Sequence, residues 1–170
     1  KTRILPASES EGPEWDTKRR EEFMKLVGND THVLASRKKV SGRKGKRFNL
    51  LRMIWIYTIK ADGRKKARLC VQGCKDWEKK DILSSSPTLG RESFRLVLFA
   101  LTQMRWECLS GDVPNAFLQQ DGSLWDREIY CIAPDCLGFG SDDILHMQKA
   151  AYWLVDAPLQ WYATLDKWFS

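Results

Sequence analysis

The sequence predicts an α+β fold in which antiparallel hairpins pack against helices. A run dense in β-branched and aromatic residues, 50–60, is followed by Asp62-Gly63 and a second strand-like run, 66–72. This order is typical of a β-hairpin closed by a two-residue turn. Helical patterns occur elsewhere, but they do not alternate with strands as βαβ units would, so a doubly wound parallel sheet is not expected.

The composition is that of a globular chain. The 170 residues are 43% hydrophobic and 29% charged, which is ordinary for a folded domain. No apolar run approaches the roughly 20 residues that a membrane span needs, and no secretory signal is visible, so no membrane association is expected. Because the chain begins at Lys1 and ends inside a helical pattern, we interpret it as an excised segment.

The cysteines predict free thiols. Their number, five, is odd, and the two closest pairs have looser spacings than most zinc sites, so a zinc centre is the weaker alternative. We therefore expect an intracellular, reducing compartment, with cytoplasm, nucleus and organelle all left open. The cysteines are Cys70, Cys74, Cys108, Cys131 and Cys136.

The N-terminal part divides into a tail and a helix. Residues 1–13 are rich in Ser, Glu and Pro and predict a polar tail. A helix is expected to begin at Asp16 or Thr17, either of which can cap it, and to end at Gly28-Asn29. The short apolar segment Val33-Leu34 then leads into a basic loop.

Cations are concentrated in this loop and in the hairpin that follows. The net charge is +6 and the pI is near 9.1. Residues 37–52 contain no acid, so they form either a solvated face or a surface that contacts the phosphates of RNA or DNA. The candidate nucleic-acid-binding residues are Arg37, Lys38, Lys39, Arg43, Lys44, Lys46 and Arg47, and the hairpin arms add Lys60, Arg64, Lys65, Lys66 and Arg68.

The C-terminal part contains two helices and several short strands. Pro87-Thr88 opens a helix whose apolar positions run to Met104. A second helix is expected from Ala157-Pro158 to Phe169, after a glycine-rich loop at 135–143. The expected strands are 106–113, 128–132 and 144–147.

The segment 106–118 supplies a candidate catalytic residue. It reads as a strand that carries one carboxylate, Asp112, to its end, followed by an aromatic, Phe117. A polymerase needs a carboxylate of this kind to hold Mg²⁺, although many ordinary strands also end in Asp.

In their order and spacing, several segments resemble the reverse transcriptase of copia-type (Pseudoviridae-like) LTR retrotransposons. Each motif alone is weak, whereas the series is specific. The segments that carry the resemblance are Trp55–Lys60, Lys66–Gly73, Ser86-Pro-Thr88, Arg95–Leu98, Asp112–Leu118, Glu128–Tyr130 and Ala157-Pro158.

The resemblance implies an RNA-directed DNA polymerase with a right-hand fold, of which this chain supplies the fingers and the start of the palm. It implies that Asp112 is a Mg²⁺ ligand, that Phe117 excludes a 2′-hydroxyl, and that Arg68 and Lys66 brace the incoming triphosphate. On this basis the chain is expected to divide into two fingers-like regions, 14–90 and 119–157, and two palm segments. The first palm segment is 91–118, and 158–170 is the start of a palm helix.

The chain also departs from the family pattern. The second metal motif, Tyr-x-Asp-Asp, is expected beyond Ser170, and Asp142-Asp143 mimics it in the wrong place. We interpret Asp142 and Asp143 as loop or cap carboxylates. Since one aspartate cannot hold two Mg²⁺ ions, the chain alone is not expected to polymerise.

A further departure is Trp153, which stands where the family has Gly, and a bulky Trp is not expected to copy the Gly backbone. Val155 and Leu159 replace two family cations. These changes leave an alternative open: an inactive, co-opted remnant that binds nucleic acid or joins other protein subunits in a ribonucleoprotein assembly. An unrelated basic α+β domain is a third alternative.

Overall fold

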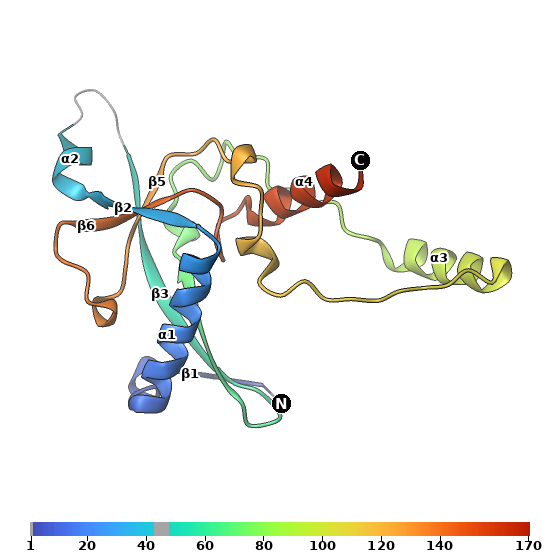
Figure 1. The fold of residues 1–170 in the computed structure, drawn as a ribbon, viewed down its shortest axis with the longest axis horizontal. Helices are drawn as coiled ribbons and strands as arrows, with labels where there is room; N and C mark the ends of the chain where they lie inside the picture. The colour runs from blue at the N-terminus through green and yellow to red at the C-terminus, as the bar shows by residue number, and fades with distance from the viewer. Residues whose placement is uncertain (1, 43–47) are drawn as a thin grey trace.

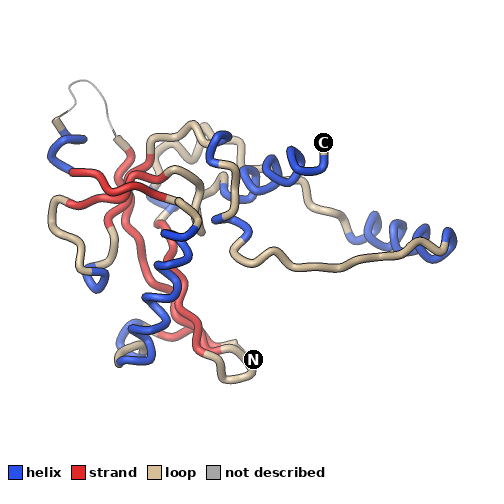
Figure 2. Tube along the Cα trace, in the orientation of Figure 1, coloured by secondary structure: helices blue, strands red, loops and turns tan. Residues whose placement is uncertain are grey.

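Strand β3 (Asn49–Ile59) is the centre of the sheet in this computed structural model, which describes residues 2–42 and 48–170. It pairs antiparallel with β4 (Lys65–Val71) and with β1 (Arg3–Leu5), and parallel with β5 (Ile129–Ile132). β5 continues to β6 (Asp143–Met147), which pairs antiparallel with β2 (His32–Ser36). The described strands therefore form one mixed sheet of six (Figures 1 and 2).

The predicted hairpin is confirmed, but its turn is longer than the two residues expected, because residues 61–63 all lie between the bonded Lys60 and Arg64. Ile59 faces Lys65 in the register, and the Lys60 backbone N–H donates to the Arg64 carbonyl at 2.9 Å. Gly63 adopts φ +81°, a value that glycine reaches without the steric cost of a side chain. On one face of β3, Leu51, Met53 and Tyr57 are buried and Trp55 is partly buried, so this face of the hairpin points into the core.

The first helix, α1 (Pro13–Gly28), confirms the helix expected there and starts three residues earlier. Pro13 occupies its first turn, where a missing N–H costs nothing. The helix lies along β4 and buries Trp15 and Leu26 (Figure 1).

The prediction that residues 1–13 form a polar tail is wrong for part of this segment. β1 pairs with β3, and Leu5 is buried in a small core with Trp15, Tyr57 and Ala67. One apolar side chain in a three-residue strand is enough to fill this gap, but it leaves no periodic pattern in the sequence.

The expected basic loop is partly ordered. Val33-Leu34 belongs to β2, and it is followed by α2 (Arg37–Ser41), which begins at a cap formed by Ser36. The Lys39 N–H donates to the Ser36 Oγ at 3.3 Å. Such a cap satisfies a backbone donor that the short helix cannot pair internally. Arg43, Lys44, Lys46 and Arg47 lie outside the described residues.

The main core lies between the sheet and the C-terminal half of the chain. Helix α4 (Ala157–Phe169), which confirms the second predicted C-terminal helix, closes one side of it through Ala157. Other buried members are Leu26, Leu51, Leu69, Val71, Leu118, Ile129, Leu145, Met147 and Leu154.

Helix α3 (Arg91–Met104) stands apart from this core. It buries none of its residues, and extended chain joins it to the rest of the molecule on both sides (Figures 1 and 2). The strand expected at 106–113 is absent: residues 106–113 are extended and exposed, and no described strand pairs with them. A strand needs a partner for its backbone groups, which the local sequence cannot supply.

Within the described residues, no helix combines the length and apolarity required to cross a membrane.

Candidate nucleic-acid interface

Three cations come together near the tip of the β3–β4 hairpin. Lys66 and Arg68 are two residues apart on β4 and therefore project from the same face, opposite to the buried Ala67 and Leu69. With Lys60 they line a cavity of about 460 Å³. Asp62 also lines this cavity, but its carboxylate is held by Arg64 at 2.6 Å. The three remaining cations give the cavity a positive character.

A second cavity, of about 270 Å³, is lined by Lys60 and Lys66 together with residues of α1. Its acids are engaged: Glu21 pairs with Lys18 at 2.8 Å, and the buried Glu22 accepts from Lys25 Nζ at 2.7 Å. The surface between α1 and the hairpin therefore presents cations in excess.

The pKa of Lys66 reflects its burial and the positive charges around it. Partial burial lowers its pKa below the usual 10.5, and the positive charge of Arg68 lowers it further, while Glu22 opposes the change. A cation whose charged form is disfavoured gains from an anionic ligand, because the ligand offsets both repulsion and lost hydration.

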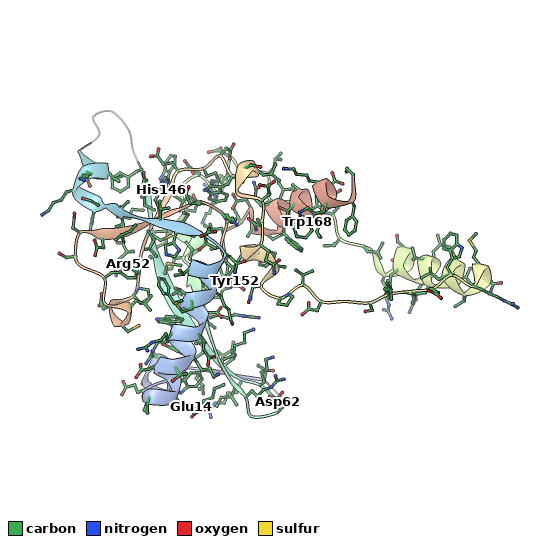
Figure 3. All side chains as sticks on the ribbon, viewed as in Figure 1. Glu14, Arg52, Asp62, His146, Tyr152 and Trp168 are labelled. Atoms are coloured by element: carbon green, nitrogen blue, oxygen red, sulfur yellow. The ribbon has the colours of Figure 1, made fainter. Side chains whose placement is uncertain are left out.

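Phe117 lies on a different structural unit, the short 3-10 helix Ala116–Leu118. Its half-buried ring packs edge-to-face on Tyr152 with centroids 6.1 Å apart. Burial, together with Glu22, raises the pKa of Tyr152 to about 12, while the charge of Arg68 acts in the opposite direction. Because the Val71 N–H donates to the Tyr152 carbonyl at 3.0 Å, the Phe117–Tyr152 pair is tied to the strand that carries Arg68. Figure 3 labels Tyr152 and, at the hairpin tip, Asp62.

Asp112 lies apart from these groups in the exposed 105–114 segment. In the described part of the chain, no three His, Cys, Asp or Glu side chains gather closely enough to hold a metal ion. Two Mg²⁺ ions need several carboxylates. The residues present around Asp112 therefore do not fit the metal centre that the family resemblance implies.

The predicted role of Asp142 and Asp143 is confirmed. Asp142 accepts from the Ser36 hydroxyl at 2.6 Å and from the Lys38 N–H at 2.9 Å, and these bonds to Ser36 and Lys38 lower its pKa. Asp143 accepts from the Gly140 N–H at 2.8 Å. Both carboxylates fix loops around α2 and β6.

The expectation that Trp153 would not adopt a glycine-like backbone conformation is wrong. Trp153 adopts φ +74°, in the left-handed region that favours glycine, although a Trp was not expected to do so. The turn is held tightly, because a Cβ at Gly73 would lie 2.1 Å from the Trp153 carbonyl oxygen. The indole itself is 57% exposed. The turn therefore combines a left-handed backbone conformation with a Trp side chain that is exposed to solvent.

The other predicted residues are placed as follows. Arg37, Lys38 and Lys39 are exposed on α2, at the end of the molecule opposite to the hairpin tip (Figure 1). They are therefore not part of the cavity lined by Lys66. Among the described residues all five cysteines are free thiols, as expected, and burial raises the pKa of Cys70 to about 11.

One buried network was missed by the sequence. Arg127 contacts Asp76 at 2.5 Å, Glu78 at 3.0 Å and Asp156 at 3.0 Å. Burial opposes the charge on Arg127, but these carboxylates prevail and raise its pKa. The four residues come from three separate segments of the chain and belong to no motif, so no sequence signal could have joined them.

Comparison with known proteins agrees with the resemblance. The family model described as "Reverse transcriptase (RNA-dependent DNA polymerase)" matches residues 40–170. The chain is 34% identical over 162 residues to the retrovirus-related Pol polyprotein from transposon TNT 1-94 of Nicotiana tabacum, covering 88% of this chain and 11% of that protein. It is 37% and 36% identical, each over 121 residues, to the corresponding polyproteins from transposons RE2 and RE1 of Arabidopsis thaliana, covering 65% of this chain and 8% of each.

The chain thus spans about a tenth of the length of the curated relatives it matches. No solved structure matches it. The matched region includes the β3–β4 hairpin, α3, the 105–118 segment and α4. The co-opted remnant is not favoured by these matches. The chain belongs to the reverse transcriptase (RNA-dependent DNA polymerase) family and is a reverse-transcriptase-like segment of the copia type.

Proposed function

We propose that this chain contributes to RNA-directed DNA synthesis by binding the phosphates of a nucleic acid or an incoming nucleotide at the cavity lined by Lys60, Lys66 and Arg68. The observation that carries the proposal is the convergence of three cations on a cavity whose one acid, Asp62, is already paired. Phosphoryl transfer depends mainly on positioning and on cations that spread phosphate charge. The cavity suits that task.

The family membership supports the same function. Lys66 and Arg68 fall in the matched region and in the segment whose resemblance implies contact with a triphosphate. We propose that Phe117, fixed against Tyr152, limits the sugar space beside them. The right-hand arrangement of fingers and palm belongs to this proposal too, with 14–90 and 119–157 as fingers.

The role proposed for Asp112 depends on further carboxylates. Reverse transcriptases use divalent metals, and Asp112 is the carboxylate at the position that the resemblance assigns to Mg²⁺. It is exposed and joins no metal-binding group within the described residues. We propose that it ligates metal only when further carboxylates are brought to it.

The experiment is a binding titration with a fluorescein-labelled single-stranded RNA of 12 nucleotides, followed by anisotropy at several salt concentrations. The variant Lys66→Gln/Arg68→Gln removes two charges from the cavity. We expect its affinity at 0.1 M salt to fall about tenfold, and its slope of log affinity against log salt to become shallower by about 1.4, the value for two lost phosphate contacts on a single strand.

The matched control is Arg91→Gln/Arg95→Gln, which removes the same charge from exposed positions on α3. We expect this control to bind RNA as the unaltered chain does. Equal loss of affinity in both variants would mean that only the net charge matters, and it would contradict a site at the hairpin.

A further inference from the structure

A large cavity with an acidic lining lies away from the hairpin. Its volume is about 700 Å³, and it opens between the segments 78–83 and 126–128 and the first turn of α4. Five carboxylates and one cation line it: Glu78, Asp81, Asp126, Glu128, Asp156 and Arg127. We call it the acidic cavity.

At the base of the acidic cavity, buried carboxylates outnumber buried cations. Arg127, whose side chain is 9% exposed, faces three carboxylates, and those of Asp76 and Asp156 are 0% and 2% exposed. The Asp156 Oδ1 is buried and accepts no hydrogen bond from any described residue. The carboxylates outnumber the cations in a place with little water, so their negative charge is only partly compensated. This excess favours the approach of another cation.

The cavity also has an apolar side. Ile82, Leu83 and Leu159 line it, and Leu83 is 80% exposed. A lysine or arginine side chain combines an aliphatic stem with a charged head, so it can cover such leucines while its head reaches carboxylates. A small hydrated ion gains nothing from the leucines.

We propose that the acidic cavity binds a lysine or arginine side chain of a basic segment from a partner protein. This site is independent of the proposed phosphate binding. Nucleic acid is repelled by the carboxylates, and no described group of three side chains is arranged to hold a metal ion. Because the chain as a whole carries a charge of +6, a cationic segment is attracted only where the local charge is negative.

The test uses a fluorescein-labelled octalysine peptide, with the same peptide fully acetylated on its lysines as the uncharged reference. The variant Asp81→Asn/Asp126→Asn neutralises two exposed carboxylates of the cavity. We expect octalysine to bind the chain, the acetylated peptide not to bind, and the variant to bind about tenfold more weakly. Thermal unfolding of the variant should be unchanged, because both side chains are exposed.

Two further variants sharpen the result. Glu92→Gln/Glu107→Gln makes the same charge change at exposed positions on α3 and just beyond it, and it should bind octalysine as the unaltered chain does. Leu83→Ser should weaken octalysine binding severalfold, because the lysine stem loses its apolar contact.

Several outcomes would overturn the proposal. One is equal weakening by the two carboxylate pairs, and another is the absence of octalysine binding. Displacement of octalysine by Mg²⁺ beyond the effect of NaCl at equal ionic strength would show an ion site instead. Self-association of the chain that Asp81→Asn/Asp126→Asn abolishes would show that a second copy, rather than a partner protein, fills the cavity.

Discussion

Trp153 combines a strained backbone with an exposed side chain. Its φ of +74° is costly for any residue with a Cβ, and the turn around it is fixed by the Val71–Tyr152 hydrogen bond and by the close approach of Gly73. The neighbouring Tyr152 holds Phe117. The strain is therefore located beside the proposed nucleotide pocket.

The strain at Trp153 can be measured by comparing two variants. Trp153→Ala removes the indole but keeps a Cβ at positive φ, whereas Trp153→Gly removes both. We expect Trp153→Gly to be more stable than Trp153→Ala by about 1 kcal/mol. Thermal unfolding should show this as a difference of roughly 2–4 °C in Tm. A Trp153→Ala variant as stable as Trp153→Gly would mean that the turn relaxes to negative φ.

At the scale of elements, β1 shows how a few residues can anchor a terminus. Leu5 is 7% exposed and packs with Trp15, Tyr57 and Ala67, while its neighbour Ile4 is 71% exposed. The two side chains point to opposite faces of the strand, as the period of two requires.

We expect Leu5→Ala to lower the free energy of unfolding by about 2–3 kcal/mol, because it removes a buried side chain and leaves a cavity. Ile4→Ala, the matched control on the exposed face, should change it by less than about 0.5 kcal/mol. Urea denaturation followed by fluorescence measures both. If the two variants were equally stable, residues 1–13 would be a polar tail after all.

Helix α3 depends on its own sequence for stability, because it buries none of its residues. Isolated helices of this length are marginal in water. In hydrogen–deuterium exchange we expect amides of α3 to exchange at least tenfold faster than those of α1 around Leu26. Protection of α3 equal to that of α1 would show that its apolar face is covered in solution.

The elements that could be predicted are those with local signals. Asp62-Gly63 between β-branched runs located the hairpin and thereby the strand that carries Lys66 and Arg68. The strand at 106–113 was wrong because a strand also needs a neighbour. β1 is too short for a pattern, and the Arg127 network joins residues that only the fold brings together. The assignments of Asp112, Phe117, Lys66 and Arg68 remain predictions.

On the scale of the whole molecule, positive and negative side chains gather in different places. A basic face of the hairpin presents Lys60, Lys66 and Arg68, and the acidic cavity beside α4 presents carboxylates. The proposed function requires contact with phosphates. The basic face is suited to that contact, and the acidic cavity is suited to a protein partner.

The most direct test of phosphate binding at the hairpin is the pKa of the Lys66 amine, followed by NMR of labelled lysine with and without inorganic tripolyphosphate. In the free chain the pKa should lie below 10.5, because burial and Arg68 disfavour the charge. An anion binds the charged amine better than the neutral one, so the ligand should raise the pKa, and affinity should fall as pH rises through it. Tripolyphosphate should change the NMR signal of the exposed Lys80 much less than that of Lys66. A Lys66 pKa that saturating tripolyphosphate leaves unchanged would contradict the account.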